Sequence, residues 1–130
     1  MGTRRASPYG ELVAEDLARG LAAAGVAVIS GLAQGIDAAA HDGALRAGGY
    51  TAAVLGTGVD RVYPTAHQAL AARLAESGGL LSEFPLGTTP RAWHFPMRNR
   101  IISGLCRAVV VVQAPASSGA LVTADRKSVV

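Results

Sequence analysis

The stretch HFPMRNRIISGLC, residues 94–106, places two arginines at the start of a predicted helix. The apolar residues that follow recur at helical spacing, which predicts a helix over 98–106. Arg98, Asn99 and Arg100 therefore fall in its first turn, where positive charge opposes the helix macrodipole by about 0.3–1 kcal/mol for each arginine. A phosphate bound between the arginines and the helix N-terminus would remove this conflict, because both attract the same anion. The alternative is a solvated helix end whose charges face water.

Glycine, serine and threonine follow the apolar segments that we expect to be strands. Because the carboxyl ends of parallel strands meet at one edge of a sheet, the turns after them should share that edge. Small residues let backbone N–H groups reach an anion there, and the following helix adds its dipole. Glycine is also needed where the chain turns tightly, whether or not a ligand binds, so a single glycine turn does not distinguish a phosphate site from a purely structural turn. Four such turns favour a phosphate site, with these candidate ligands: Ser30, Gly31, Gly35, Gly56 and Gly58.

Helical and strand patterns alternate strictly along the chain. A helix is expected after Ser7, a typical N-cap, with Pro8 in its first turn and Gly25 at its end. The expected strands are short apolar runs of the kind buried on both faces of a sheet. This order predicts an α/β protein with three layers and a mostly parallel sheet. The expected strands are 26–30, 51–56, 80–84 and 107–114, and the expected helices are 9–25, 36–48, 65–79, 98–106 and one that begins within 117–124.

Composition limits the classes of protein to which the chain can belong. With 130 residues, 50% of them hydrophobic and 16% charged, the chain suits one globular domain and is not a disordered protein. No apolar run approaches the ~18 residues that span a membrane, and residues 1–10 lack the apolar core of a signal peptide. Cys106 is the only cysteine, which excludes a disulfide framework and a cysteine-rich zinc site. We therefore expect a cytoplasmic protein with no membrane partner.

The net charge of +3 is mildly basic, and the basic residues are almost all arginine. The only lysine among the twelve is Lys127. Arginine offers a planar fork suited to phosphates and to stacking on bases. A GC-rich genome also favours arginine codons, and this explanation carries more weight. The net charge is compatible with a nucleic-acid partner but does not by itself indicate one.

The residue pattern gives little support to metal or hydrolase chemistry. Asp37 and His41 lie four apart on one helical face, but no third ligand stands at a suitable spacing. We expect no metal; Asp37 should support the first turn of its helix and His41 should pack beside the sheet. No serine lies in the G-x-S-x-G pattern of nucleophilic serines. Glu83 could act as a general base in a nucleotide-cleaving enzyme, but a bond to neighbouring loop amides is favoured.

Aromatic residues gather in the expected loops and are nearly absent from the strands. Beside arginine they suit base stacking, which contributes about 1–3 kcal/mol per base. They could equally seal the ends of the sheet, and the sequence leaves these two alternatives open. The residues are Tyr63, Phe84, Trp93 and Phe95.

Taken together, these stretches resemble the DprA/Smf family, the DNA-processing proteins of natural transformation. The resemblance covers residues 2–124 almost without a gap, in the family's order and spacing. The matching motifs are GTRRASPYG (2–10), SGLAQGIDAAAH (30–41), LGTGVDRVYP (55–64), SEFPLG (82–87), FPMRNRIISGL (95–105) and SSGALVTA (117–124).

The resemblance implies a Rossmann-like domain that binds single-stranded DNA and is not an enzyme. No cofactor is implied. The full-length family has RecA and single-strand-binding protein as further partners and is expected to form a homodimer. Its positively charged DNA pocket carries over to Arg4, to the turn with Gly56 and Gly58, to Arg61 just before Tyr63, and to the R-N-R helix start. With the strand-end turns and the neighbouring aromatics, the expected DNA-binding residues are Arg4, Ser30, Gly31, Gly35, Gly56, Gly58, Arg61, Tyr63, Phe95, Arg98, Asn99 and Arg100.

The two ends of the chain depart from the family pattern. Family members have a strand immediately before the turn at residues 2–5, and further helix and strand after residue 124. Residues 1–124 are therefore expected to be a partial domain that lacks the first strand and the C-terminal part, to which dimerisation and RecA contact are attributed. Residues 125–130, DRKSVV, can be encoded by a sequence that resembles a common sequencing adapter, and we expect this tail to be an artefact.

One alternative comes from another class of protein. Nucleotide phosphoribohydrolases and cofactor carriers with related folds bind a mononucleotide on the same edge of the sheet. Those proteins usually show a P-G-G-x-G-T-x-x-E turn, which this sequence lacks. A nucleotide-binding or nucleotide-hydrolysing protein is therefore the second hypothesis.

Overall fold

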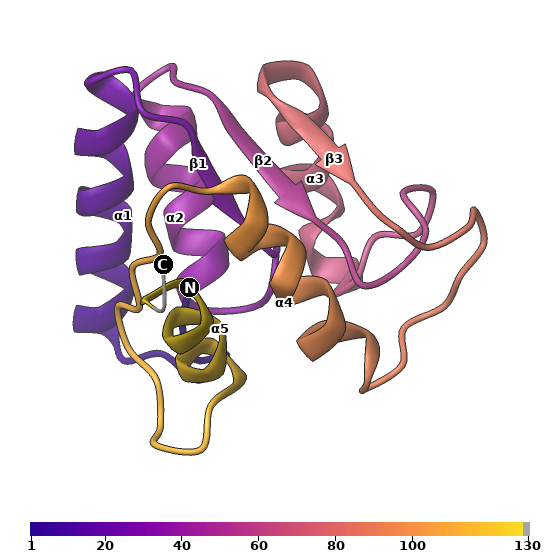
Figure 1. Cartoon of the computed structure of the whole chain (residues 1–130). Helices are drawn as coiled ribbons and strands as arrows, with labels where there is room; N and C mark the ends of the chain where they lie inside the picture. The colour runs from indigo at the N-terminus through magenta and orange to yellow at the C-terminus, as the bar shows by residue number, and fades with distance from the viewer. Residues whose placement is uncertain (129–130) are drawn as a thin grey trace.

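A computed structural model describes residues 1–128 of the chain, so residues 129 and 130 of the expected tail lie outside the described part. Helices and strands alternate as predicted up to residue 105, but within the described residues no strand separates the last two helices (Figure 1). The last helix continues past residue 124 and ends at Ser128. The elements are α1 (Pro8–Ala23), β1 (Val28–Ser30), α2 (Ile36–Arg46), β2 (Thr51–Val54), the 3-10 turn η1 (Thr65–His67), α3 (Gln68–Ser77), β3 (Gly79–Leu81), α4 (His94–Leu105) and α5 (Gly119–Ser128).

The three strands form one parallel sheet in the order β1-β2-β3. Ala53 in the central strand pairs with Ser30 on one side and Leu80 on the other. Every residue of β2 is buried, as expected for a strand covered on both faces. The prediction of a mostly parallel sheet is confirmed.

Helices cover both faces of this sheet, so the predicted three-layer architecture is confirmed. In Figure 1, α4 lies in front of the sheet and α2 and α3 lie behind it, and α1 packs along α2. The core beneath α3 is apolar and closely packed. It consists of Leu32, Ala53, Leu55, Ala71 and Leu74.

The first helix begins where the sequence predicts and ends two residues before the predicted Gly25. Ser7 is its N-cap, and the Ser7 hydroxyl accepts a hydrogen bond from the Gly10 N–H at 3.0 Å. Pro8 occupies the first helical position, where its missing N–H is not needed. The helix ends at Ala23, two residues before Gly25, whose φ of +84° carries the chain out of the helix.

Helix α4 begins four residues earlier than predicted, at His94. Pro96 lies in its first turn, where a proline is tolerated because those N–H groups have no partner inside the helix. Arg98 and Arg100 therefore lie beyond the first turn, and the predicted conflict with the helix N-terminus is wrong.

The predicted strand over 107–114 is also wrong. Within the described residues, this segment makes only one isolated bridge, between Gly2 and Gln113, in parallel orientation. Val112 donates to the Met1 carbonyl at 3.1 Å, and Thr3 donates to the Gln113 carbonyl at 2.7 Å. The apolar run therefore lies beside residues 1–3 without forming a regular ladder with them.

No helix among residues 1–128 combines the length and the apolar character needed to cross a bilayer.

Candidate functional site

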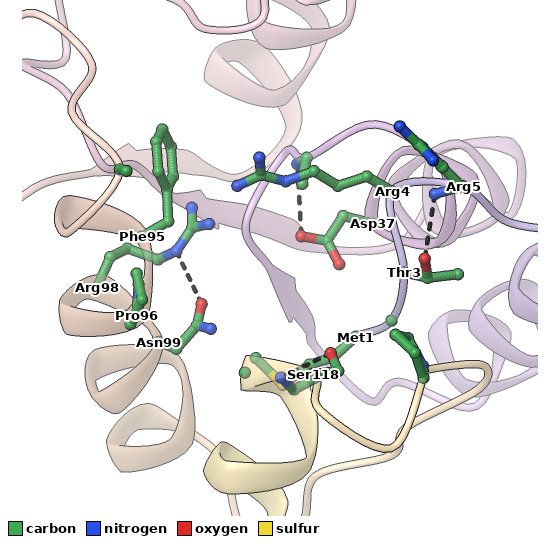
Figure 2. Close-up of a pocket in the computed structure, with 16 residues that line it drawn as sticks. Met1, Thr3, Arg4, Arg5, Asp37, Phe95, Pro96, Arg98, Asn99 and Ser118 are labelled. Carbon is green, nitrogen blue, oxygen red and sulfur yellow. Dashed lines mark hydrogen bonds between the residues drawn. The ribbon is translucent and has the colours of Figure 1, made fainter.

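A cavity of about 430 Å³ opens at the carboxyl edge of β1 and β2, where the N-terminal turn, α4 and the start of α5 meet (Figure 2). A smaller cavity of about 100 Å³ adjoins it, and Arg4, Phe95 and Arg98 line both. The larger cavity is bounded by Met1, Gly2, Thr3, Arg4, Arg5, Ala33, Asp37, Ala92, Phe95, Pro96, Arg98, Asn99, Pro115, Ser118, Gly119 and Ala120.

Arg98 is buried at the floor of this site, with 4% of its surface exposed. Its Nη1 donates to the Gly31 carbonyl at 2.8 Å and to the Val54 carbonyl at 2.6 Å, so it joins the carboxyl ends of β1 and β2. Its Nε donates to the Asn99 side-chain oxygen at 3.0 Å. Burial lowers the pKa of Arg98, the Asp37 carboxylate opposes that change, and the charge of Arg4 adds to it. Arginine stays protonated at neutral pH all the same.

Arg4 and Arg98 converge on one aromatic ring. The Cζ atoms of Arg4 and Arg98 lie 5.0 and 5.4 Å from the centre of the Phe95 ring, within the range of cation–π contacts. Figure 2 shows the two guanidinium groups extending toward each other beside Phe95. Tyr63 adds a second ring, centred 5.6 Å from that of Phe95. The site thus combines two like charges with two aromatic faces.

Asp37 holds the turn after β1 in place. Its Oδ2 accepts hydrogen bonds from the N–H groups of Gly31 at 3.1 Å and Ala33 at 3.4 Å. The carboxylate thus occupies the position that the sequence analysis assigned to a bound anion, and these two N–H groups are already bonded within the protein. Asp37 lies in the first turn of α2, as expected, but its carboxylate bonds the preceding turn and does not cap the helix. Gly31 contributes its small size, because a Cβ there would lie 2.7 Å from the Arg98 Cζ.

Gly35 brings the N-terminal turn against the start of α2. Its φ is +84°, and a Cβ there would lie 2.6 Å from the Thr3 carbonyl oxygen, so only glycine fits. Thr3 immediately precedes Arg4, so this close approach fixes the backbone that carries the outer arginine of the cavity. Ser30 lies deeper, 1% exposed, and its hydroxyl has no hydrogen-bond partner within the described part of the chain.

The two other glycines support loops around the site. Gly56 packs under Phe95, since a Cβ there would lie 2.9 Å from the ring. Gly58 lies farther out, where its N–H donates to the Thr88 carbonyl at 3.1 Å. Gly58 therefore joins two loops and does not line either cavity.

Two predicted arginines are not brought to the cavities. Arg61 is exposed and lines neither of them. Arg100 points to Glu83 and forms an ion pair with it. The favoured interpretation of Glu83, a bond to loop amides, is corrected by this pair; the opposite charge of Arg100 attracts the carboxylate more strongly than neutral amides do.

No group of three potential metal ligands exists among the residues described here. His41 is fully buried beside the sheet, and its Nδ1 lies 2.8 Å from the Thr51 hydroxyl oxygen. Burial lowers the pKa of His41 to about 4, so the ring is neutral near pH 7. The expectation that His41 packs beside the sheet is confirmed.

The aromatic residues divide into two clusters on either side of Gly56. Tyr63 and Phe95 face the arginines, while Phe84 and Trp93 surround the buried ring of His94. Part of this second cluster seals the end of the sheet, because His94 is 3% exposed and its Nδ1 lies 2.8 Å from the Gly56 carbonyl. Trp93 does not seal it, because 60% of the surface of Trp93 is exposed.

Sequence reasoning missed several residues that line the larger cavity. Arg5 adjoins Arg4, and its charge could have been counted with it. Ser118 and Gly119 lie in the turn that was expected to follow a fourth strand, and neither was predicted as a ligand. Thr3 and Pro96 carry no such signal, because they line the cavity through the path of the backbone.

Comparison with known proteins places the chain among DNA-processing proteins. It is 51% identical to Protein Smf of Escherichia coli over 125 residues, which cover 95% of the chain and 33% of that protein. It is 48% identical to Protein Smf of a Synechocystis strain over 124 residues, covering 95% of the chain and 31% of that protein. The chain thus spans about a third of the length of these curated relatives.

Solved structures give the same result. The X-ray structure of DNA processing protein A from Streptococcus pneumoniae matches with a TM-score of 0.90 and 44% identity, over 98% of this chain and 45% of that one. The structure of DNA processing protein A from Helicobacter pylori, described by its single-stranded DNA binding mode, matches with a TM-score of 0.86 and 33% identity, over 98% and 58%. The fold is therefore the Rossmann-like fold of these proteins. A model of the family described as DNA recombination-mediator protein A matches residues 1–128, and the chain belongs to that family.

Proposed function

We propose that the chain binds single-stranded DNA through the cavity lined by Arg4, Phe95 and Arg98. The observation that carries this proposal is the convergence of two guanidinium groups on the Phe95 ring. Two like charges held this close repel each other, and a phosphate placed between them would relieve the repulsion. The Helicobacter pylori relative, described as binding single-stranded DNA, supports the choice of ligand.

The charges around the larger cavity favour an anionic ligand. Arg4 and Arg5 are exposed at its mouth, and Arg98 lies at its floor. Asp37 is the one acid among its lining residues, and its carboxylate already accepts two backbone hydrogen bonds. The cavity is therefore electropositive, and phosphate contacts of this kind bind DNA with strong salt dependence and little sequence preference.

The hypothesis of a nucleotide-hydrolysing enzyme loses its candidate base in this structure. Glu83 lines neither cavity and is paired with Arg100. We therefore propose a DNA-binding protein without catalytic activity, acting in the cytoplasm. As a member of its family, the full-length protein would load RecA onto the bound strand, help displace single-strand-binding protein, and form a homodimer.

We propose that residues 1–124 supply the DNA-binding part of such a mediator. The assignment of residues 125–130 to a sequencing adapter stays a prediction, which resequencing of the locus tests. The contributions of Arg61 and Arg100 to DNA binding also stay predictions, because neither residue lines a cavity.

A fluorescence-anisotropy titration with labelled oligo-dT at low and moderate salt tests the proposal. Arg4→Ala should weaken binding about tenfold at low salt and reduce the salt dependence by about one phosphate contact. Arg19→Ala is the matched control, because Arg19 is an exposed arginine on α1 whose partner is Asp16. Equal affinities of the wild type and Arg4→Ala, or a folded protein that binds a mononucleotide and ignores DNA, would overturn it.

A further inference from the structure

Trp93 is a large aromatic side chain left in solvent at the start of a helix. It is the only tryptophan of the chain, and 60% of its surface is exposed. It lies immediately before α4, which begins at His94. A ring of this size is usually buried or lies at an interface, so its exposure makes Trp93 a candidate ligand contact.

The Trp93 ring is held in place by its neighbours. It meets the ring of His94 edge to face, with centres 4.3 Å apart, and His94 stacks on Phe84 with centres 4.1 Å apart. His94 is itself fixed, because it is buried and its Nδ1 lies 2.8 Å from the Gly56 carbonyl. An anchored ring loses little conformational freedom on stacking with a ligand, which favours binding.

The Trp93 cluster is continuous with the proposed DNA site. A Cβ at Gly56 would lie 2.9 Å from the Phe95 ring and 3.5 Å from the Cβ of His94, so Gly56 touches both aromatic clusters. Ala92, which precedes Trp93, lines the larger cavity. Ala92 and Phe95, on either side of Trp93 in the sequence, therefore both lie at the cavity, which places Trp93 close to its edge.

We propose that Trp93 stacks against a base of the single strand whose phosphates lie at Arg4 and Arg98. This inference rests on the proposed function and adds a base-stacking subsite outside the cavity. The flat face of a tryptophan accepts any base, so the subsite adds affinity without sequence preference. Arg91, exposed two residues before Trp93, adds positive charge for the backbone of the same strand.

Because the chain has one tryptophan, emission excited at wavelengths that its three tyrosines do not absorb reports on this ring alone. The wild-type chain is titrated at low salt with unlabelled oligo-dT and with an abasic oligomer of the same number of phosphates. Binding of each oligomer is followed in parallel by anisotropy of a labelled copy. The variants are Trp93→Ala, Trp93→Phe and, as the matched control, Leu86→Ala, which removes another exposed apolar side chain, 73% exposed, from the connection before α4.

We expect oligo-dT to change the tryptophan emission strongly and the abasic oligomer to bind with little change in emission. Trp93→Ala should weaken oligo-dT binding by about fivefold or more, while Trp93→Phe and Leu86→Ala should stay within about threefold and twofold of the wild type. Binding of oligo-dT without an emission change, an equal change with the abasic oligomer, or an unaltered affinity of Trp93→Ala would overturn the subsite and leave the proposed function standing. If neither oligomer binds, the proposed function fails and the subsite fails with it.

Discussion

Arg98 donates to the carbonyl oxygen of Gly31 at 2.8 Å, across 67 residues of sequence. The same nitrogen donates to the Val54 carbonyl at 2.6 Å, so one buried guanidinium gives hydrogen bonds to carbonyl oxygens at the carboxyl ends of two parallel strands. A residue that the sequence suggested as a ligand for phosphate is thus also part of the structure that shapes the site.

We expect Arg98→Ala to lower the free energy of unfolding by about 2–4 kcal/mol, because two buried carbonyl groups lose their donor. Arg98→Lys keeps the charge but not the planar fork, and should lose about half as much. Urea denaturation followed by circular dichroism measures both. Arg100→Ala is the control, since its exposed pair with Glu83 contributes no more than about 1 kcal/mol. An Arg98→Ala protein as stable as Arg100→Ala would contradict the structural role of Arg98.

His41 should make the fold sensitive to acid. The pKa of His41 is 6.5 in the unfolded chain and about 4 in the folded protein, because burial disfavours the charged ring. The stabilisation is complete above pH 6.5 and is lost as the pH falls toward 4, by up to about 3 kcal/mol. Urea denaturation from pH 7 to pH 4 measures this loss. In His41→Asn, we expect the decline over this range to be smaller by about that amount; an identical decline would show that another group is responsible.

We expect Asp37→Asn to separate stability from DNA binding. The variant loses the charge that strengthens the hydrogen bonds from Gly31 and Ala33, and should lower the free energy of unfolding by about 1–2 kcal/mol. It also removes the one acid from the cavity lining, so oligo-dT should bind equally well or a few times more tightly at low salt. Denaturation and anisotropy on the same sample check both. A folded Asp37→Asn protein that no longer binds oligo-dT would contradict this interpretation.

Gly35→Ala should disturb the turn that carries Arg4. An alanine at position 35 would have to adopt a φ of +84°, and its methyl group would clash with the Thr3 carbonyl oxygen. We therefore expect the free energy of unfolding to fall by about 1–3 kcal/mol and DNA binding to weaken. Gly20→Ala, at an open position on α1, is the matched control and should stabilise the helix by up to about 1 kcal/mol. Thermal unfolding compares the two variants, and a neutral Gly35→Ala would mean that the N-terminal turn can move.

The sequence predicts those parts of the fold that depend on local patterns. The N-cap at Ser7, the three paired strands and the parallel order all follow from spacing and from strictly alternating elements. It fails where a segment depends on a partner distant in the sequence. The apolar run over 107–114 looks like a strand, but its pairing depends on residues 1–3, which no periodicity reveals.

The same reason limits what the sequence says of the site. Arg4, Phe95 and Arg98 are named correctly as lining one place, yet the burial of Arg98 depends on two carbonyl groups that only the folded sheet presents. The pair of Arg100 and Glu83 joins α4 to the connection after β3 across 17 residues, and neither local sequence pattern predicts it. The helix start was predicted too late because Pro96, a residue that usually lies at a helix boundary, is part of the first turn of α4.

Asp37 gives the turn after β1 its final shape before any DNA arrives. No part of that turn has to fold during binding, so an oligonucleotide should meet a rigid surface whose outermost charges are Arg4 and Arg5. Encounters of this kind are limited by diffusion and accelerated by electrostatic attraction. We therefore expect added salt to slow the association rate constant much more than it changes the lifetime of the complex.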